Sequence, residues 1–415
     1  MSLTVLFRKY TFLIKKILLL SASVLLIYSI LKLFDNLIGL KASKPDLMEN
    51  RKAVYMTSEY AFIADTNSKG FRGKDYSVDK PENSLRILAI GDSFTYGWGV
   101  DIEYTWPFLL EKKLSGQYKD KRVEVINLGV GGAVPSEYSE IAEEYILLYK
   151  PDFVIVGFVE GNDFAQITTS VEKGKKVISS ETTVRRQKLL DELADSNNIL
   201  DKRIRINNFI RSVFPNIHKL ISKRNTIEIR LSFIEKMRKY ILQLDDEDID
   251  ELNRRMNPDV RKLFMAGGLN PYLFIASIRT PDYFIKILES DDSFYQNGID
   301  EINKVISNIK SIATANNAEV TVLDIPYGVF VNKRHMMIYR EMGFTGRDNI
   351  WTSDAGESIT VRAAETAGVD YLKTLDVFRK ECMDDCFFKY DDHMTPKGYR
   401  ILSDAVFEKF ITLVK

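Results

Sequence analysis

The sequence predicts an α/β fold in which a parallel sheet is covered by helices on both faces. Three observations predict it: short, nearly continuous apolar runs, helical segments that separate these runs, and turn residues where the runs end. A strand that is buried on both faces carries such a run, and a parallel neighbour requires a crossover that is usually a helix. Functional residues in such sheets lie beyond the carboxyl ends of the strands.

The strands and helices alternate in two blocks. In the first block we expect strands at 85–90, 123–127 and 152–158 and helices at 104–114 and 136–149. In the second block we expect helices at 299–315, 357–367 and 396–414, a strand at 319–326 and an extended segment at 369–372. Pro151 ends the second helix of the first block, because proline cannot continue a helix.

Residues 165–293 separate the two blocks and form a charged, mostly helical insertion. Apolar residues recur there at helical spacing, namely Phe233, Ile234, Met237, Tyr240, Ile241 and Leu244. We expect this stripe to pack in the core, because most amphipathic helices bury their apolar face within the fold. A lid or a membrane-contacting face is the alternative.

The composition excludes several classes of function. The 415 residues carry 58 basic and 58 acidic side chains, so no charge surplus points to nucleic acid. The three histidines are scattered, and the single cysteine pair lacks the spacing of metal ligands, so we expect no metal. No phosphate-binding loop pattern occurs either, and we expect no cofactor.

The N-terminal segment predicts a membrane anchor. Residues 17–31 carry no charge, and apolar neighbours extend the run to 10–34, enough for a helix that spans a bilayer. Basic residues precede the run, so we expect a cytoplasmic N-terminus and a periplasmic or extracellular catalytic domain. A cleaved signal peptide is the alternative, although no small-x-small cleavage site follows the run. The predicted organisation is an anchor at 1–40, a stalk at 41–81 and a catalytic domain at 82–415.

Three loops at the carboxyl ends of the first strands carry candidate functional residues. Ser93 follows the first strand, where backbone N–H groups can stabilise the oxyanion of acyl transfer. Gly132 ends the second loop, and Asn162 follows the third strand with an amide that can donate to the same oxyanion. Each residue taken alone also fits a helix cap or a plain turn.

A serine nucleophile requires a base, and the base requires a carboxylate that orients it. His393 stands just before the last predicted helix and has two acidic neighbours, Asp391 and Asp392. His218 and His335 have no acidic neighbour, so His393 is the favoured base.

The order of these residues along the chain resembles that of the SGNH/GDSL hydrolase family. The matching blocks are Gly91-Asp92-Ser93, Gly132 within 127–132, Gly161-Asn162-Asp163 and Asp391-Asp392-His393. The resemblance covers about 67–163 and 319–415, and the stretch GDSFTYGWGV is similar to envelope-associated bacterial members.

This resemblance implies a flavodoxin-like three-layer α/β/α sandwich. It also implies Ser93 as nucleophile, His393 as base, and an oxyanion hole formed by the Ser93 and Gly132 N–H groups and the Asn162 amide. The commonest family spacing puts an aspartate at the position of Tyr390, whereas related acetyl-esterase and acetyltransferase branches use Asp-x-His, which favours Asp391.

The geometry of a turn also favours Asp391 as the triad acid. A side chain two residues away can fold back to the imidazole, whereas the adjacent residue of an extended segment points the opposite way. We therefore expect Asp392 to face solvent or to cap the helix that begins near Pro396. Cys382 and Cys386 lie just upstream, and an oxidising exterior favours a disulfide between them over two free thiols.

These observations lead to an enzyme hypothesis with two variants. The first is a hydrolase that removes acyl groups, above all O-acetyl, from an envelope carbohydrate or another acylated small molecule. The second is an O-acyltransferase in which a sugar hydroxyl replaces water. A catalytically silent envelope scaffold is a third hypothesis, which the presence of Ser93, Asn162 and His393 disfavours.

Overall fold

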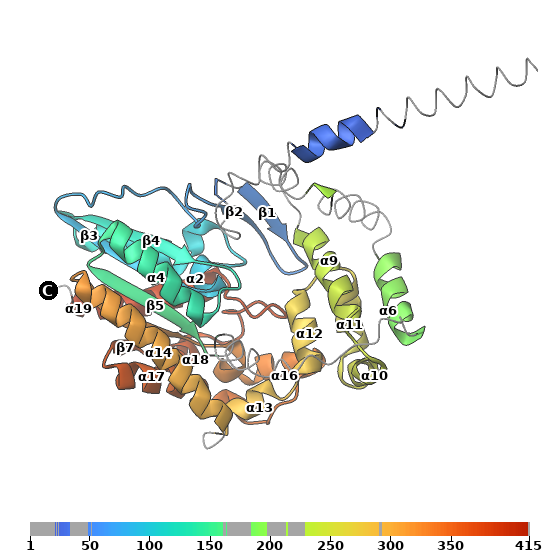
Figure 1. The fold of residues 1–415 in the computed structure, drawn as a ribbon. Coiled ribbons are helices and arrows are strands. Elements are labelled where there is room, and N and C mark those ends of the chain that lie inside the picture. The colour runs from blue at the N-terminus through green and yellow to red at the C-terminus, as the bar shows by residue number, and fades with distance from the viewer. Residues whose placement is uncertain are drawn as a thin grey trace, which may run out of the picture. The chain divides into compact units, whose positions relative to one another are not determined.

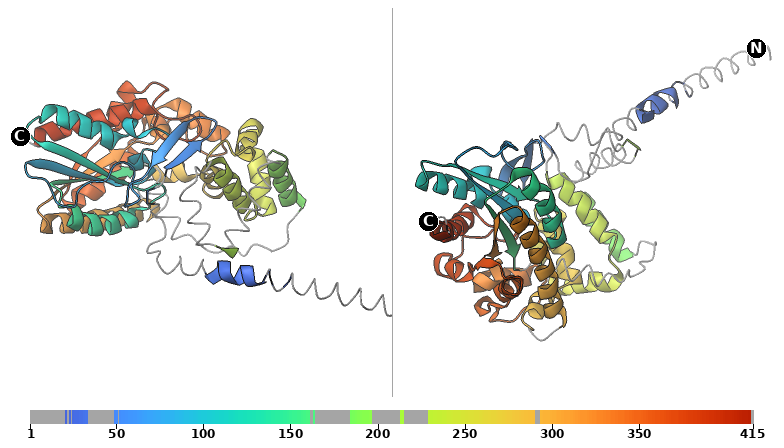
Figure 2. Two further views of the ribbon diagram at one scale, coloured as in Figure 1. Left: turned by 90° about the horizontal axis from the view of Figure 1, so that it is seen from above. Right: turned by 60° about the vertical axis from the view of Figure 1, so that its left-hand side comes forward.

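The computed structural model describes residues 21, 23, 25–33, 49–50, 52–160, 163, 184–196, 213–214, 229–289 and 293–413 (Figures 1 and 2). The chain divides into two compact units, 1–47 with 199–226 and 48–198 with 227–415. In the first unit residues 25–33 are helical. Within the described ranges no helix has the length and apolar content needed to cross a membrane. Most of the predicted anchor at 10–34 lies outside these ranges.

The second unit is built on a parallel sheet, as predicted. Its five strands are β3 (Ser84–Gly91), β4 (Arg122–Gly129), β5 (Phe153–Val159), β6 (Glu319–Ile325) and β7 (Asp370–Leu372). They pair in the order β4-β3-β5-β6-β7, and every neighbouring pair is parallel. This is the strand order of flavodoxin-like doubly wound sheets, in which the crevice beside the first strand is the usual site.

Helices cover both faces of this sheet. They are α3 (Trp106–Gln117), α4 (Pro135–Tyr149), α14 (Ser293–Ala315), α17 (Ala355–Ala367) and α19 (Pro396–Leu413). The crossover from β3 to β4 runs in the opposite direction to the later crossovers, so right-handed connections place α3 on one face and α4, α14 and α17 on the other. Accordingly, α3 packs against α19, while α4 and α17 pack against α14 (Figure 2).

The described part of the insertion is helical, as predicted. Its helices are α6 (Val184–Asp195), α9 (Ile229–Ile241), α10 (Asp246–Arg255), α11 (Pro258–Met265), α12 (Pro271–Arg279) and α13 (Tyr283–Ile287). Phe233, Met237 and Leu244 of the apolar stripe are buried, so the prediction of core packing is confirmed.

The region 41–81 differs from the predicted stalk. It contains an antiparallel hairpin of β1 (Lys52–Met56) and β2 (Ala61–Asp65), which is part of the same unit as the sheet. Phe62 and Ala64 of β2 are buried, whereas the alternate residues Ala61, Ile63 and Asp65 are exposed. β1 packs against α9, and the Ser58 hydroxyl in the turn donates to the Gly268 carbonyl at 2.9 Å. The hairpin therefore lies against the insertion (Figure 1).

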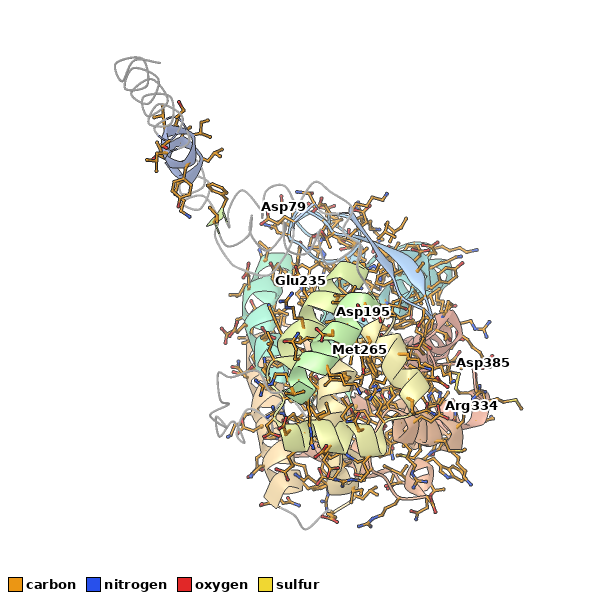
Figure 3. All side chains as sticks on the ribbon, turned by 90° about the vertical axis from the view of Figure 1, so that its right-hand side faces the viewer. Asp79, Asp195, Glu235, Met265, Arg334 and Asp385 are labelled. Atoms are coloured by element: carbon orange, nitrogen blue, oxygen red, sulfur yellow. A yellow bond between two sulfur atoms is a disulfide. The ribbon has the colours of Figure 1, made fainter. Side chains whose placement is uncertain are left out.

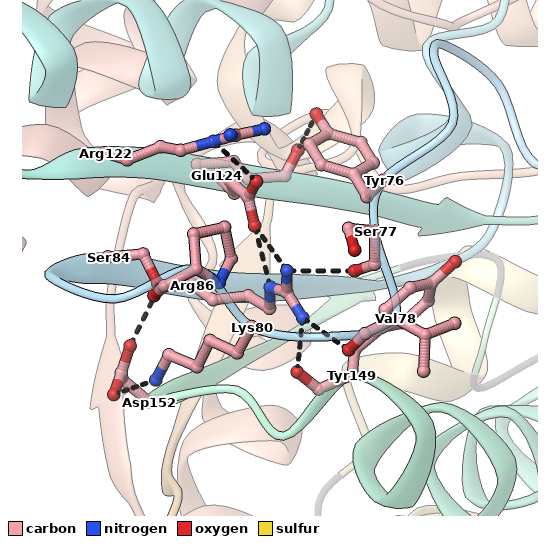
Figure 4. Close-up of polar contacts among 12 residues, drawn as sticks. Tyr76, Ser77, Val78, Lys80, Ser84, Arg86, Arg122, Glu124, Tyr149 and Asp152 are labelled. Carbon is pink, nitrogen blue, oxygen red and sulfur yellow. Dashed lines mark hydrogen bonds and ion pairs between the residues drawn. The ribbon is translucent and has the colours of Figure 1, made fainter.

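The segment that follows the hairpin is fixed to the amino-terminal end of the sheet by a buried ion pair (Figure 4). The Arg86 guanidinium pairs with Glu124 at 2.7 Å, and both side chains are almost completely buried. The same guanidinium donates to the carbonyls of Ser77 at 3.0 Å, Val78 at 3.3 Å and Tyr149 at 2.7 Å. These bonds satisfy the donors of a cation that burial would otherwise strongly destabilise. They hold residues 77 and 78 against the sheet.

Candidate active site

Ser93 lies where β3 ends and the short helix α2 (Ser93–Tyr96) begins. The Asp92 carboxylate caps this helix by accepting from the Phe94 N–H at 2.8 Å. Gly97 ends it with φ of 85°, a left-handed conformation that favours glycine, and its N–H donates to the Ser93 carbonyl at 3.0 Å. The backbone is thus held on both sides of Ser93, and Ser93 itself is buried.

The structure brings Ser93, His393 and Asp391 together. Nε2 of His393 lies 2.7 Å from Oγ of Ser93, although 300 residues separate them in sequence. Nδ1 of His393 is hydrogen-bonded to Oδ1 of Asp391. With Nδ1 protonated, Nε2 is free to accept the serine proton, which is the arrangement required of a general base.

The conformation of Asp392 explains how Asp391 reaches His393. Asp392 has φ of 64°, so the backbone turns sharply between its two neighbours. The residues before and after Asp392 pair with each other as in a β-hairpin, since the Phe388 N–H donates to the His393 carbonyl at 2.9 Å. This pairing supports the turn.

The expectation that Asp392 faces solvent or caps the last helix is wrong. Its side chain is 1% exposed, because the left-handed turn rotates it into the protein. Nδ1 of His335 lies 3.7 Å from its carboxyl, and burial raises the pKa of Asp392 well above its ordinary value. Burial also lowers the pKa of His335 to about 4, so this imidazole is neutral near pH 7.

The predicted oxyanion donors come from two further loops. Gly132 lies in the loop after β4 with φ of 81°, and open space surrounds the position that its Cβ would occupy. The Val130 N–H in that loop donates to the Gly91 carbonyl at 3.0 Å, which ties it to the strand that carries Ser93. Asn162 lies outside the described residues. Its neighbour Asp163 is buried and accepts from the Val159 N–H and the Tyr138 hydroxyl, both at 2.7 Å.

Cys382 and Cys386 form a disulfide with a Cα–Cα distance of 5.6 Å. Its loop is anchored on two sides. The Arg334 guanidinium contacts the Asp384 carboxylate at 3.0 Å, and Lys397 contacts Asp385 at 2.6 Å (Figure 3 labels Arg334 and Asp385). The Thr395 N–H donates to the Cys386 carbonyl at 2.9 Å, so the disulfide loop braces the segment that carries His393.

The hairpin contributes contacts to the site that the sequence did not predict. The Tyr60 hydroxyl donates to Oδ2 of Asp391 at 2.8 Å and accepts from Nε1 of Trp98 at 2.7 Å. The neighbouring Glu59 carboxylate accepts from the Tyr390 N–H at 2.9 and 3.0 Å. Trp98 stands within the stretch that resembles the family, but no local signal relates Tyr60 to a residue 331 positions later.

Arg72 joins the segment after the hairpin to the loop that follows Ser93. Its buried guanidinium donates to the carbonyls of Gly97, Val100 at 2.5 Å and Ile63 at 3.1 Å. It also lies over the Tyr96 ring at 5.3 Å. One side chain thus crosslinks β2 to residues 96–100, the backbone that adjoins the nucleophile.

Buried acids lie at the ends of β5 and β6. Burial and the charge of Asp324 raise the pKa of Glu160 well above its ordinary value, and burial raises that of Asp324 to about 8. Both shifts favour the protonated forms of these carboxyls. Among the described residues, no group of histidine, cysteine and acidic side chains is arranged to hold a metal ion.

A doubly wound sheet with a buried serine, histidine and aspartate in hydrogen-bond contact at its carboxyl edge defines a serine hydrolase. The particular family follows from the sequence. The model of the GDSL-like lipase/acylhydrolase family matches residues 87–406, and the chain belongs to this family.

Solved structures with similar folds include several esterases. A catalytic variant of an acetylxylan esterase from Geobacillus stearothermophilus is 10% identical, with 80% of this chain and 96% of that chain covered and a TM-score of 0.38. The psychrotrophic esterase EstA from Pseudoalteromonas sp. is 10% identical, with 80% and 99% covered and a TM-score of 0.34. No curated protein matches the sequence.

Proposed function

We propose that this chain hydrolyses acyl esters with Ser93 as nucleophile, His393 as general base and Asp391 as the acid that orients it. The observation that carries this proposal is the 2.7 Å contact between Nε2 of His393 and Oγ of Ser93, with Nδ1 of the same ring on Asp391. Family membership supports ester hydrolysis independently of this contact.

The proposed reaction has two steps, formation of an acyl-enzyme and its hydrolysis. Ser93 Oγ attacks the ester carbonyl while Nε2 of His393 takes its proton, and the tetrahedral oxyanion collapses to an acyl-enzyme as His393 returns that proton to the departing alcohol. Water then attacks the acyl-enzyme in the same way and releases the carboxylic acid. The N–H groups of Ser93 and Gly132 and the amide of Asn162 are the donors that we assign to the oxyanion.

We propose a small acyl group, above all acetyl, on an envelope carbohydrate as the substrate. Half-buried aromatic side chains support this choice, since Trp98 packs at 6.1 Å from the His393 ring and Tyr96 at 6.3 Å from Trp98. Gly131 lies beside the Trp98 indole, so the ring adjoins the loop that carries Gly132. Aromatic faces at this place offer apolar surface to a sugar ring or an acyl chain.

An activity screen tests the function and its two variants. Aryl esters of graded chain length and an acetylated glycan are offered to the chain and to its Ser93→Ala variant. We expect release of acetate by the parent chain, and loss of about 10³-fold or more in turnover in the variant. Transfer of the acetyl group to an added sugar acceptor, rather than to water, would identify the acyltransferase instead. Turnover that survives Ser93→Ala would exclude both.

We also propose that residues 10–34 anchor the chain in the cytoplasmic membrane with the catalytic domain outside. The described helical residues Leu25, Leu26 and Leu33 support this, since each side chain is more than 60% exposed although apolar. A cysteine introduced on the surface of the second unit should react with an impermeant reagent in outer-permeabilised cells. Labelling only after complete lysis would contradict this topology.

A further inference from the structure

The geometry points to Tyr60, on the β1–β2 hairpin, as a positioning residue that holds the triad acid Asp391. This inference rests on the proposed function, because it assigns Asp391 to the triad. Tyr60 precedes the 87–406 segment that matches the family, so the contact adds a part of this chain that the family match does not include. Tyr60 and Asp391 are both buried.

The direction of each proton in this network is fixed by chemistry. The indole of Trp98 can only donate, so the oxygen of Tyr60 accepts at 2.7 Å. The single phenolic proton must then point to another acceptor, and Oδ2 of Asp391 lies 2.8 Å away. The Asp391 carboxylate therefore receives one proton donor on each oxygen, Tyr60 on Oδ2 and His393 on Oδ1.

The packing around Tyr60 makes this contact rigid. Its ring lies 4.8 Å from that of Phe388, which belongs to the loop that carries Asp391 and His393, and 5.9 Å from that of Phe62 on β2. The adjacent Glu59 carboxylate binds the Tyr390 N–H at 2.9 Å, so two consecutive hairpin residues hold this loop. Burial raises the pKa of Tyr60 well above 10, which keeps its hydroxyl a donor throughout the working pH range.

A carboxylate bonded at both oxygens cannot rotate away from the imidazole. Removal of the Tyr60 hydroxyl would leave Oδ2 of Asp391 buried without that donor, which is costly for a charged acceptor. The Asp391 carboxylate would then interact more strongly with His393 and stabilise its protonated imidazole. Because catalysis requires the neutral imidazole, the acidic limb of the rate profile should move to higher pH.

The test is Tyr60→Phe, assayed with 4-nitrophenyl acetate and with a fluorophosphonate probe, on the full chain in mild detergent. Titration with the probe gives the concentration of reactive sites, and kcat is calculated per reactive site. Unfolded chains therefore do not lower the measured kcat. We expect kcat to fall about 10-fold and KM to stay within about twofold of the value for the parent chain. The acidic limb of the pH–rate profile should lie at higher pH than in the parent chain. An unchanged kcat together with an unchanged limb would overturn the inference.

Tyr76→Phe is the matched control. The Tyr76 hydroxyl also donates to a carboxylate at 2.8 Å, that of Glu111, and also contacts the Val125 carbonyl, four residues before β4 ends. This control should lose stability but keep kcat per site and the pH profile. A similar fall in kcat in both variants would show that Tyr60 is merely structural and would overturn the inference.

A double-mutant cycle separates this inference from the proposed function. If Tyr60 acts through Asp391, then Tyr60→Phe should change the phosphonylation rate less than twofold in an Asp391→Asn background. Multiplicative losses would refute that coupling while leaving the serine mechanism intact. Turnover that survives Ser93→Ala would instead refute the proposed function, whatever the Tyr60 variant does.

Discussion

Glu59 should make the stability of this protein decrease as pH rises, and Glu59→Gln should remove that dependence. The half-buried Glu59 carboxyl, in the hairpin turn, accepts the Tyr390 N–H at 2.9 and 3.0 Å. Burial, together with the negative charge of Asp391, raises its pKa from 4.5 to about 7. The folded chain thus binds a proton at this site more tightly than the unfolded chain does.

The sign and size of the effect follow from linkage. A carboxyl whose pKa is raised by folding contributes stability that is complete below its unfolded pKa and is lost as pH rises through its folded pKa. Each pH unit in that interval corresponds to about 1.4 kcal/mol, so the loss between pH 4.5 and 7 approaches about 3 kcal/mol. Glutamine keeps an oxygen that accepts the Tyr390 N–H but cannot ionise.

Denaturant unfolding of the full chain at pH 5 and pH 8.5 measures this contribution. Glu59→Gln should match the parent chain at pH 5 within about 1 kcal/mol and exceed its free energy of unfolding by about 2–3 kcal/mol at pH 8.5. Glu137→Gln is the control, because Glu137 also accepts a backbone N–H, from Val134 at 2.8 Å, but at an exposed site. Parallel pH dependences of the Glu59 variant and the parent would refute the reasoning.

Four other substitutions test separate parts of the structure. Asp391→Asn should lower kcat by about 10³-fold or more, because Asp391 holds Nδ1 of His393. Asp392→Asn should keep kcat within about threefold, because its carboxyl lies beside His335 and not beside His393; rates of ester hydrolysis decide between them. Glu124→Gln should cost about 3 kcal/mol in denaturant unfolding without changing kcat, because it leaves the buried Arg86 unpaired at the far end of the strands; an equal stability would contradict this. Cys382→Ser should lower the free energy of unfolding by about 2 kcal/mol, as expected for a short closed loop, and an unchanged denaturant midpoint would argue against that contribution.

Much of the fold could be predicted because the sheet leaves a strong local pattern. A strand such as 85–90 is apolar except for Arg86 because both of its faces are buried, and a glycine follows where α2 crosses the end of the sheet. The pairing of Ser93 with His393 could be predicted as well, although the residues are 300 positions apart, because a serine nucleophile requires a base and His393 has acidic neighbours in a motif order that resembles the family.

The hairpin and the orientation of Asp392 could not be predicted for the opposite reason. The strand 61–65 has only five residues and stands within a polar, mixed region, so its short apolar run does not by itself specify a strand. Asp392 faces inward because of a single left-handed φ of 64°, and nothing in the sequence specifies on which side of the turn its side chain lies. The Tyr60 contact depends on tertiary packing alone.

Peptide mapping of the fluorophosphonate adduct tests the central claim most directly. The probe reacts with a serine that an adjacent base activates, and in this chain Ser93 lies 2.7 Å from Nε2 of His393. The account predicts one adduct per chain, located on Ser93, whose formation stops in Ser93→Ala and slows at least 10³-fold in His393→Ala. An adduct on another serine, or ester hydrolysis that persists in a chain fully modified at Ser93, would contradict it.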